Sequence, residues 1–390
     1  METHGAQWVR GPIIGRGSFG SVYLAYSKKP YSYLPPAMAV KSAEVSDSAS
    51  LQKEVEVLKN LQGSPYVIRC FGEETTIGAN GEMVYNVLLE YASGGSLDTL
   101  IKKSKSSGVC GGLPELDVRR YARHLLLGLA HIHQSGYVHC DLKPDNILLV
   151  PCRNCGSMTK FVAKIGDFGL AKRERQSKKA KFDHCLRGTA PYLAPEVVVN
   201  RVQEAPADIW ALGCVVLEML TGGSPWGSDS NLTAEELFNK IADSGALPKT
   251  PIGISNEAKD FLKRCLVRNP MFRFTADMLL DHPFFGGCED GYDAVEEDVG
   301  EVGQAIGVGS SCWPEDELSS LLVPADWCSV SDEDSDSLPC SGFEDFKVYA
   351  STAEQLILTG HKRKRSSHFI PITDGDFFLT TIAPTVAAGL

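Results

Sequence analysis

The pattern of hydrophobic and polar positions predicts a strand-rich first part of the chain. Residues 8–27 fit two strands around a glycine turn, because Val22, Tyr23 and Leu24 suit a strand. Residues 37–41 and 84–91 are apolar runs that favour two further strands. Between them, residues 50–61 carry leucine and valine at helical spacing and predict one helix.

The pattern becomes helical after the glycine pair at residues 94–95. In residues 115–134, apolar side chains recur along one face of a long helix. Shorter helices are expected near residues 207–220, 233–244, 256–267 and 276–280. A strand-rich part followed by a helix-rich part predicts two lobes, and ligand clefts often lie at such a boundary.

Charge separates the C-terminal part of the chain from the rest. The 390 residues carry a formal net charge of −11, but residues 289–346 hold 17 acidic residues and no Lys or Arg. The remainder has 32 acidic and 38 basic residues, so it is mildly basic. We expect residues 286–346 to be a largely disordered acidic, serine-rich segment, and no fold is assigned to residues 347–390. Nothing in this balance suggests nucleic-acid binding.

A glycine-rich turn opens the candidate chemistry. Residues 15–20 read Gly-Arg-Gly-Ser-Phe-Gly and lie between two predicted strands. Glycines let backbone N–H groups approach phosphates closely, although the motif alone also fits a plain hairpin turn. A dinucleotide-binding turn would lie between a strand and a helix, so the strand–strand context disfavours that fold.

Lys41 ends an apolar strand, where a charged side chain is costly unless it is paired. A phosphate and a carboxylate would pair it. Glu54 is the preferred carboxylate because Leu58 follows it by one helical turn, and Glu56 is the competitor on another face of the same helix. An exposed surface lysine is the simpler alternative.

The segment His139-Cys140-Asp141-Leu142-Lys143-Pro144-Asp145-Asn146 carries the strongest chemical signal. Asp141 can accept or orient the proton of an incoming hydroxyl, and Lys143 can neutralise charge on a transferred phosphoryl group. Asn146 and Asp167, which opens Asp167-Phe168-Gly169, can hold Mg²⁺. Their order after a glycine loop and a strand lysine makes coincidence a poor explanation.

These motifs resemble the eukaryotic protein kinase family from about Trp8 to Phe285. The resemblance implies an α+β, bilobal protein kinase fold with a small β-rich N-lobe, a larger helical C-lobe and a mostly disordered acidic tail. It implies ATP and Mg²⁺ as cofactors, catalytic roles for Asp141, Lys143, Lys41 and Glu54, and metal binding by Asn146 and Asp167. The residues implied to bind ATP are Ile14, Gly15, Gly17, Ser18, Gly20, Val22, Ala39, Lys41, Glu90, Ala92 and Leu148.

Two features favour Ser/Thr over Tyr as the acceptor: Lys143 in the catalytic loop, and Gly188-Thr189 shortly before Glu196. A Glu196–Arg273 ion pair is also implied. Residues 188–197 and 206–214 resemble the plant mitogen-activated protein kinase kinase kinases, which implies a MAP kinase kinase as protein substrate. Ala190 and Leu193 differ from the residues that are commoner at these positions in that group.

Three alternatives stay open at this point. The chain could be a pseudokinase scaffold, a Ser/Thr kinase outside the MAP kinase cascade, or a kinase whose tail serves mainly as an adaptor. Pseudokinases usually lack one of the residues equivalent to Lys41, Asp141, Asn146 or Asp167, and all four are present. Upstream regulators or tail-binding proteins are further candidate partners.

Cys140 stands where most regulated kinases carry the arginine that pairs with an activation-loop phosphate. A cysteine cannot make that pair, and residues 170–195 contain few phosphorylation targets, among them Ser177. We therefore hypothesise that catalysis does not require activation-loop phosphorylation. The alternative is that Cys140 is only a small buried filler.

The sequence gives weaker indications of location. No apolar leader precedes residue 15 and no run approaches the ~18 apolar residues of a membrane span, so we expect a cytoplasmic protein without membrane contact. Residues 361–365, His-Lys-Arg-Lys-Arg, form a basic cluster that fits a nuclear import signal. A chance cluster of bases is an equally good explanation.

Overall fold

The computed structural model describes residues 5–17, 20–29, 33–78, 80–106, 111–152, 161–174, 186–227 and 232–286. The predictions for the acidic segment, for residues 347–390 and for the basic cluster concern the tail beyond residue 286, and so lie outside the described residues. Ser18 and Ser177 lie outside them as well.

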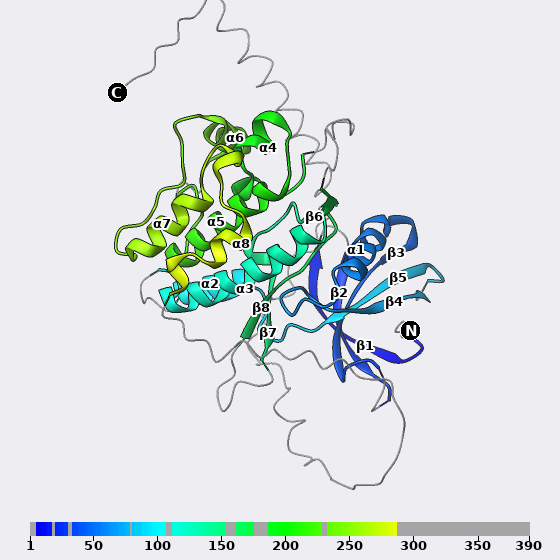
Figure 1. Ribbon diagram of the computed structural model, residues 1–390. Coiled ribbons are helices and arrows are strands. Elements are labelled where there is room, and N and C mark those ends of the chain that lie inside the picture. Colours follow the sequence, from blue (N-terminus) through cyan, green and yellow to red (C-terminus); the bar gives the residue numbers. More distant parts are fainter. Residues whose placement is uncertain are drawn as a thin grey trace, which may run out of the picture.

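The first lobe is a five-stranded antiparallel sheet with one long helix, seen in blue in Figure 1. The strand order is β1-β2-β3-β5-β4, and each neighbouring pair is antiparallel. The bounds are β1 Trp8–Gly17, β2 Gly20–Ser27, β3 Ala37–Glu44, α1 Ala49–Asn60, β4 Cys70–Ile77 and β5 Met83–Glu90.

α1 forms because its buried side chains recur at helical spacing. Leu51, Glu54, Val55 and Leu58 are buried, and the helix contacts both β4 and β5. Glu54 therefore shares the face that α1 turns to the rest of the protein, whereas Glu56 is exposed. The helix predicted over residues 50–61 is present within one residue at each end.

The second lobe is mainly helical and is drawn in cyan, green and yellow in Figure 1. Its helices are α2 Leu97–Ser106, α3 Glu115–Gln134, α4 Pro195–Asn200, α5 Ala205–Thr221, α6 Ala234–Ala242, α7 Asn256–Cys265 and α8 Ala276–Leu280. Its short strands are β6 Tyr137–Val138, β7 Ile147–Pro151, β8 Phe161–Ile165 and β9 Lys172–Arg173, paired as β6–β9 and β7–β8.

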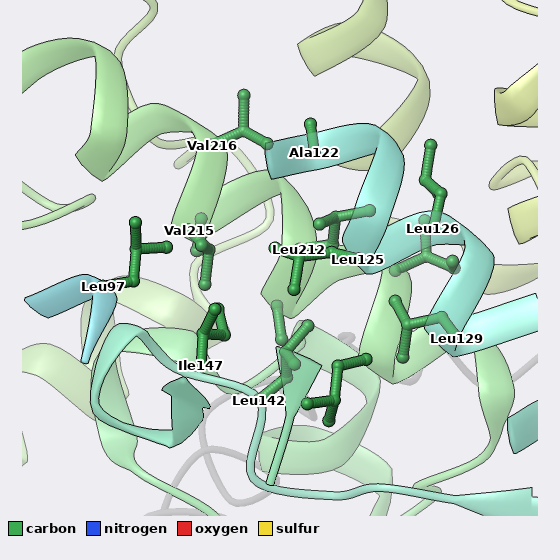
Figure 2. Close-up of a cluster of buried hydrophobic side chains, with 14 of the residues drawn as sticks. Leu97, Ala122, Leu125, Leu126, Leu129, Leu142, Ile147, Leu212, Val215 and Val216 are labelled. Carbon is green, nitrogen blue, oxygen red and sulfur yellow. The ribbon is translucent and has the colours of Figure 1, made fainter. Parts of the chain in front are cut away.

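The core of this lobe forms where α3 and α5 meet the catalytic loop. Figure 2 shows leucines of α3 facing Leu212, Val215 and Val216 of α5, with Leu142 and Ile147 completing the cluster. α5 has apolar residues around most of its circumference, so it is buried along nearly its whole length. It ends at Gly222, whose left-handed φ of 68° suits a glycine cap.

The two lobes join where β7 and β8 lie against the segment that leads into β4. Ile68 N donates to Ile165 O at 2.9 Å, and Ile165 N donates to Tyr66 O at 2.9 Å. These backbone bonds hold the Asp167 segment, which follows β8, at the edge of the first lobe. Among the described residues, no helix is long and apolar enough to cross a bilayer.

Candidate active site

The glycine turn connects β1 to β2 over the edge of the sheet. Gly15 pairs with Val22 and Gly17 with Gly20 in the antiparallel register. Gly20 has a φ of 132°, and a Cβ there would stand 2.2 Å from Ser42 O, so only glycine fits. A Cβ on Gly17 would meet nothing within 4 Å, so packing inside the protein does not require glycine at this position. Space beside bare backbone suits the close approach of a phosphate.

Lys41 lies on β3 and reaches two carboxylates from different parts of the chain. Its Nζ is 2.8 Å from Glu54 Oε2 and 3.0 Å from Asp167 Oδ1. Glu54 also accepts a hydrogen bond from Phe168 N at 3.2 Å through Oε1. The structure thus has the Lys41–Glu54 pairing expected from the helix pattern. One glutamate links β3, α1 and the Asp167-Phe168-Gly169 segment.

Burial and charge set the protonation of this group. Burial disfavours the Lys41 ammonium, but Glu54 and Asp167 outweigh it and raise its pKa above the usual value. Burial also opposes ionisation of Asp167, yet Lys41 holds the pKa of that carboxyl below its usual range. The lysine is therefore a fixed cation and Asp167 a fixed anion near neutral pH. Asp167 is 34% exposed, which leaves it accessible to a ligand.

Asp141 lies at the centre of a second cluster, in the catalytic loop between β6 and β7. Its Oδ1 accepts a hydrogen bond from Thr189 Oγ1 at 2.7 Å. Its Oδ2 lies 3.1 Å from Lys143 Nζ and accepts from Asn146 Nδ2 at 3.1 Å. The carboxylate is oriented on both oxygens, and one oxygen already accepts from an alcohol hydroxyl. That is the geometry a base needs toward a Ser or Thr substrate.

The residues present suit a hard divalent cation. Asn146 Nδ2 donates hydrogen bonds to the backbone O and to Oδ2 of Asp141. These bonds orient the amide, and its oxygen can then act as a metal ligand. Asp167 supplies a carboxylate, with a left-handed φ of 59°. Oxygen ligands of this kind, completed by substrate phosphates, are the usual Mg²⁺ arrangement. No group of three or more His, Cys, Asp or Glu residues that could hold a metal occurs within the described ranges.

The predicted adenine-binding residues come from both lobes. Ile14, Val22 and Ala39 lie on β1, β2 and β3, and Leu148 lies on β7. Ala39 is buried, and the other three are partly buried. Glu90, the last residue of β5, and Ala92, two residues later, are also partly buried. The Glu90 carboxylate is bound to Lys164 Nζ at 2.8 Å, so a ligand at this position would meet backbone. Adenine binding by these residues stays a prediction.

A protein-family comparison decides what this arrangement belongs to. The model of the protein kinase domain matches residues 8–285. The chain is a member of the protein kinase family. Mitogen-activated protein kinase kinase kinase 20 of Arabidopsis thaliana is 43% identical over 279 residues, which cover 71% of this chain and 78% of the relative. Mitogen-activated protein kinase kinase kinase 17 of Arabidopsis thaliana is 40% identical over 279 residues, which cover 71% of this chain and 69% of the relative.

A more distant relative extends the likeness beyond plants. Mitogen-activated protein kinase kinase kinase A of Dictyostelium discoideum is 33% identical over 300 residues, covering 74% of this chain and 29% of the relative. The chain is accordingly an ATP-dependent Ser/Thr protein kinase of the mitogen-activated protein kinase kinase kinase group. The expected fold, with a β-sheet N-lobe and a helical C-lobe, is confirmed.

Asp208 of α5 is a supporting residue that sequence reasoning named only within a family motif. It accepts from His139 N at 2.8 Å and from Cys140 N at 3.0 Å, and His133 Nε2 lies 2.9 Å away. Burial opposes ionisation of this carboxyl, but His133 outweighs it and lowers its pKa. Asp208 thereby fixes the backbone of the kinase catalytic loop, including the left-handed φ of 71° at Cys140.

Cys140, directly before Asp141, contacts the backbone of its own loop. Its side chain is buried, and its Sγ lies 3.5 Å from Val138 O. Burial, which is the main cause, and nearby Asp208 raise the pKa of the thiol well above its usual value, so it stays protonated and unreactive. The position before Asp141 therefore offers the kinase neither a charge nor a nucleophile.

Proposed function

We propose that this kinase uses Mg-ATP to phosphorylate MAP kinase kinases on Ser or Thr. The observation that carries the proposal is a pair of polar clusters built from both lobes: Lys41 with Glu54 and Asp167, and Asp141 with Asn146. The printed names of the plant relatives support the choice of protein substrate. A scaffold without chemistry is not favoured, because every polar group needed for transfer is present and oriented.

The transfer follows from these positions. The substrate hydroxyl oxygen attacks the γ-phosphorus of ATP, the bond to the β,γ-bridging oxygen breaks, and ADP leaves with that electron pair. Asp141 accepts the hydroxyl proton, as its hydrogen bond from Thr189 Oγ1 illustrates. Lys143 lies 3.1 Å from the same carboxylate and could neutralise charge on the transferred phosphoryl group.

Lys41 and the metal ligands would hold the rest of the nucleotide. Mg²⁺ bound by Asp167 and Asn146 would neutralise phosphate charge. Lys41 would contact phosphate oxygens while Glu54 fixes its position. Because the buried Glu54 carboxylate already fixes the Lys41 ammonium, the lysine needs little reorganisation when the nucleotide binds.

The proposed substrate is tested by phosphate transfer to a catalytically inactive MAP kinase kinase. The matched control is the same protein with alanine at the Ser and Thr positions of its activation loop, and a MAP kinase is the third substrate. We expect labelling of the first protein only. If a generic Ser/Thr substrate is labelled and the MAP kinase kinase is not, the cascade assignment is wrong and the kinase activity stands.

A further inference from the structure

Two residues immediately before α5, Gln203 and Glu204, connect parts of the active site that are far apart in sequence. Gln203 is buried, and its Nε2 donates to Cys140 O at 3.1 Å and to Arg187 O at 3.0 Å. One amide group therefore ties the catalytic loop to the end of the activation segment. Thr189, which contacts Asp141, follows Arg187 by two residues.

Glu204 makes the corresponding contact at the other end of the same segment. Its Oε1 lies 3.0 Å from Lys172 Nζ, and the two side chains are only 21% and 12% exposed. Lys172 is on β9, which follows the Asp167 motif, and it pairs in register with Val138 of β6, which leads into the catalytic loop. The ion pair thus joins the start of the activation segment to the base of α5.

The base of α5 is itself fixed to the catalytic loop. Asp208, in the first turn of α5, holds the backbone N–H groups of His139 and Cys140. Gln203, Glu204 and Asp208 consequently form one anchor to which the catalytic loop and both ends of the activation segment are attached. Arginine paired with a phosphate gives kinases an anchor of this kind only after phosphorylation.

We propose that Gln203 and Glu204 are positioning residues that replace that phosphate permanently. The Glu204 carboxylate supplies the negative charge that pairs with Lys172. The Gln203 amide joins the backbone carbonyls of Cys140 and Arg187, so the catalytic loop is tied to the activation segment without a charged side chain at residue 140. Catalytic geometry is then present without modification of the activation segment. The inference rests on the proposed kinase activity, but it does not depend on which protein is the substrate.

The test uses the full chain after treatment with a protein phosphatase. Steady-state kinetics are measured for wild type, Glu204→Gln, Lys172→Met and the reversed pair Lys172→Glu with Glu204→Lys, on dephosphorylated casein and on inactive MAP kinase kinase. Glu115→Gln is the matched control, since Glu115 forms a comparably buried ion pair with Arg119 on α3. Thermal unfolding shows that each variant is folded.

We expect phosphatase treatment to leave the wild-type rate unchanged. Glu204→Gln and Lys172→Met should each lower kcat by about tenfold or more, because the loss of positioning is felt in the transition state, while KM for ATP changes by less than about twofold. The reversed pair should recover most of the lost kcat. Glu115→Gln should keep the wild-type kcat per folded molecule.

Three results would overturn the inference: loss of wild-type activity on phosphatase treatment, a wild-type kcat in folded Glu204→Gln and Lys172→Met, or a reversed pair as slow as the single variants. Failure of the proposed substrate gives a different pattern. In that case casein is labelled and MAP kinase kinase is not, and the kcat comparison is still read on casein.

Discussion

Two buried ion pairs, one in each lobe, show how similar chemistry serves different ends. Lys41–Glu54 crosses from β3 to α1 and has a further carboxylate, Asp167, at 3.0 Å. Arg273–Glu196 lies inside the C-lobe at 2.7 Å, as the family resemblance implied. The Arg273 guanidinium is fully buried and also donates to Val267 O and Pro206 O, so its donors are used within the protein.

The difference lies in what each pair leaves available. The C-lobe pair is saturated, and its side chains join the activation segment helix α4 to the segment before α8. The cleft pair includes Asp167, one third of which is exposed, and it connects elements of two lobes. An ion pair whose hydrogen-bond donors are all used inside the protein stabilises the fold. An ion pair that includes a partly exposed carboxylate, as Asp167 is, can exchange contacts with a bound nucleotide.

Breaking the C-lobe pair should have the largest effect on stability. Glu196→Gln leaves the buried Arg273 charge without its anionic partner, which costs about 3–5 kcal/mol in unfolding free energy. Chemical denaturation with urea measures this loss. We expect kcat per folded molecule to stay close to wild type, and a stable variant with a collapsed kcat would show that this pair also serves catalysis.

Breaking the cleft pair should instead reduce activity. Lys41→Met removes the ammonium expected to contact phosphate and should lower kcat by about 100- to 1000-fold, as for loss of one electrostatic stabiliser. Burial already raises the pKa of Glu54, with Lys41 opposing it, so the glutamate can take up a proton when its partner is gone. Stability should therefore fall less than in Glu196→Gln.

Steady-state phosphate transfer and thermal unfolding check this prediction together. Lys59→Met is the matched control, because Lys59 pairs with Glu73 at 2.7 Å on the surface of the same lobe. It should leave both readouts near wild type. If Lys41→Met unfolds as readily as Glu196→Gln, the proposed division between the two ion pairs is wrong.

A buried histidine sharpens the comparison through pH. His124 of α3 accepts a hydrogen bond from Ala163 N at 3.2 Å, and burial lowers its pKa from 6.5 to about 4. In the unfolded chain His124 takes up a proton as pH falls below 6.5, whereas in the folded protein it stays neutral until pH approaches 4. The contribution of neutral His124 to the unfolding free energy is therefore complete above pH 6.5, and about 3 kcal/mol of it is lost as pH falls toward 4.

Urea unfolding at several pH values between 7 and 4.5 tests this sign. His124→Asn keeps an acceptor for Ala163 N but cannot titrate, so its unfolding free energy should depend less on pH over this interval. A wild type and variant with equal slopes would contradict the assignment of this acid sensitivity to His124.

The sequence predicted those parts of the fold that have a regular pattern. α3 begins and ends at the expected residues, and α1 placed Glu54 rather than Glu56 beside Lys41 because helical spacing distinguishes their faces. α2 was not expected, since it buries only Leu97 and Ile101 after two glycines. The two-residue strands β6 and β9 are too short to show any periodicity.

Non-local polar contacts outside the recognised motifs were beyond reach for a different reason. Thr189 was noticed only as part of a Ser/Thr-kinase motif, and its hydrogen bond to Asp141 became visible once the fold brought them together. Gln203 and Glu204 give no local signal at all, because isolated polar residues before a helix usually face solvent. Their partners, Cys140 and Lys172, are distant in sequence.

The most direct test of the central claim is transfer of labelled phosphate from Mg-ATP by wild type and Asp141→Asn, followed by identification of the phosphorylated amino acid. Asparagine keeps the size of the side chain but cannot accept the substrate proton. We expect phosphoserine or phosphothreonine from wild type and a rate at least about 100-fold lower from the variant. Equal rates in the two proteins, or no transfer by folded wild type that binds ATP, would contradict catalysis at Asp141.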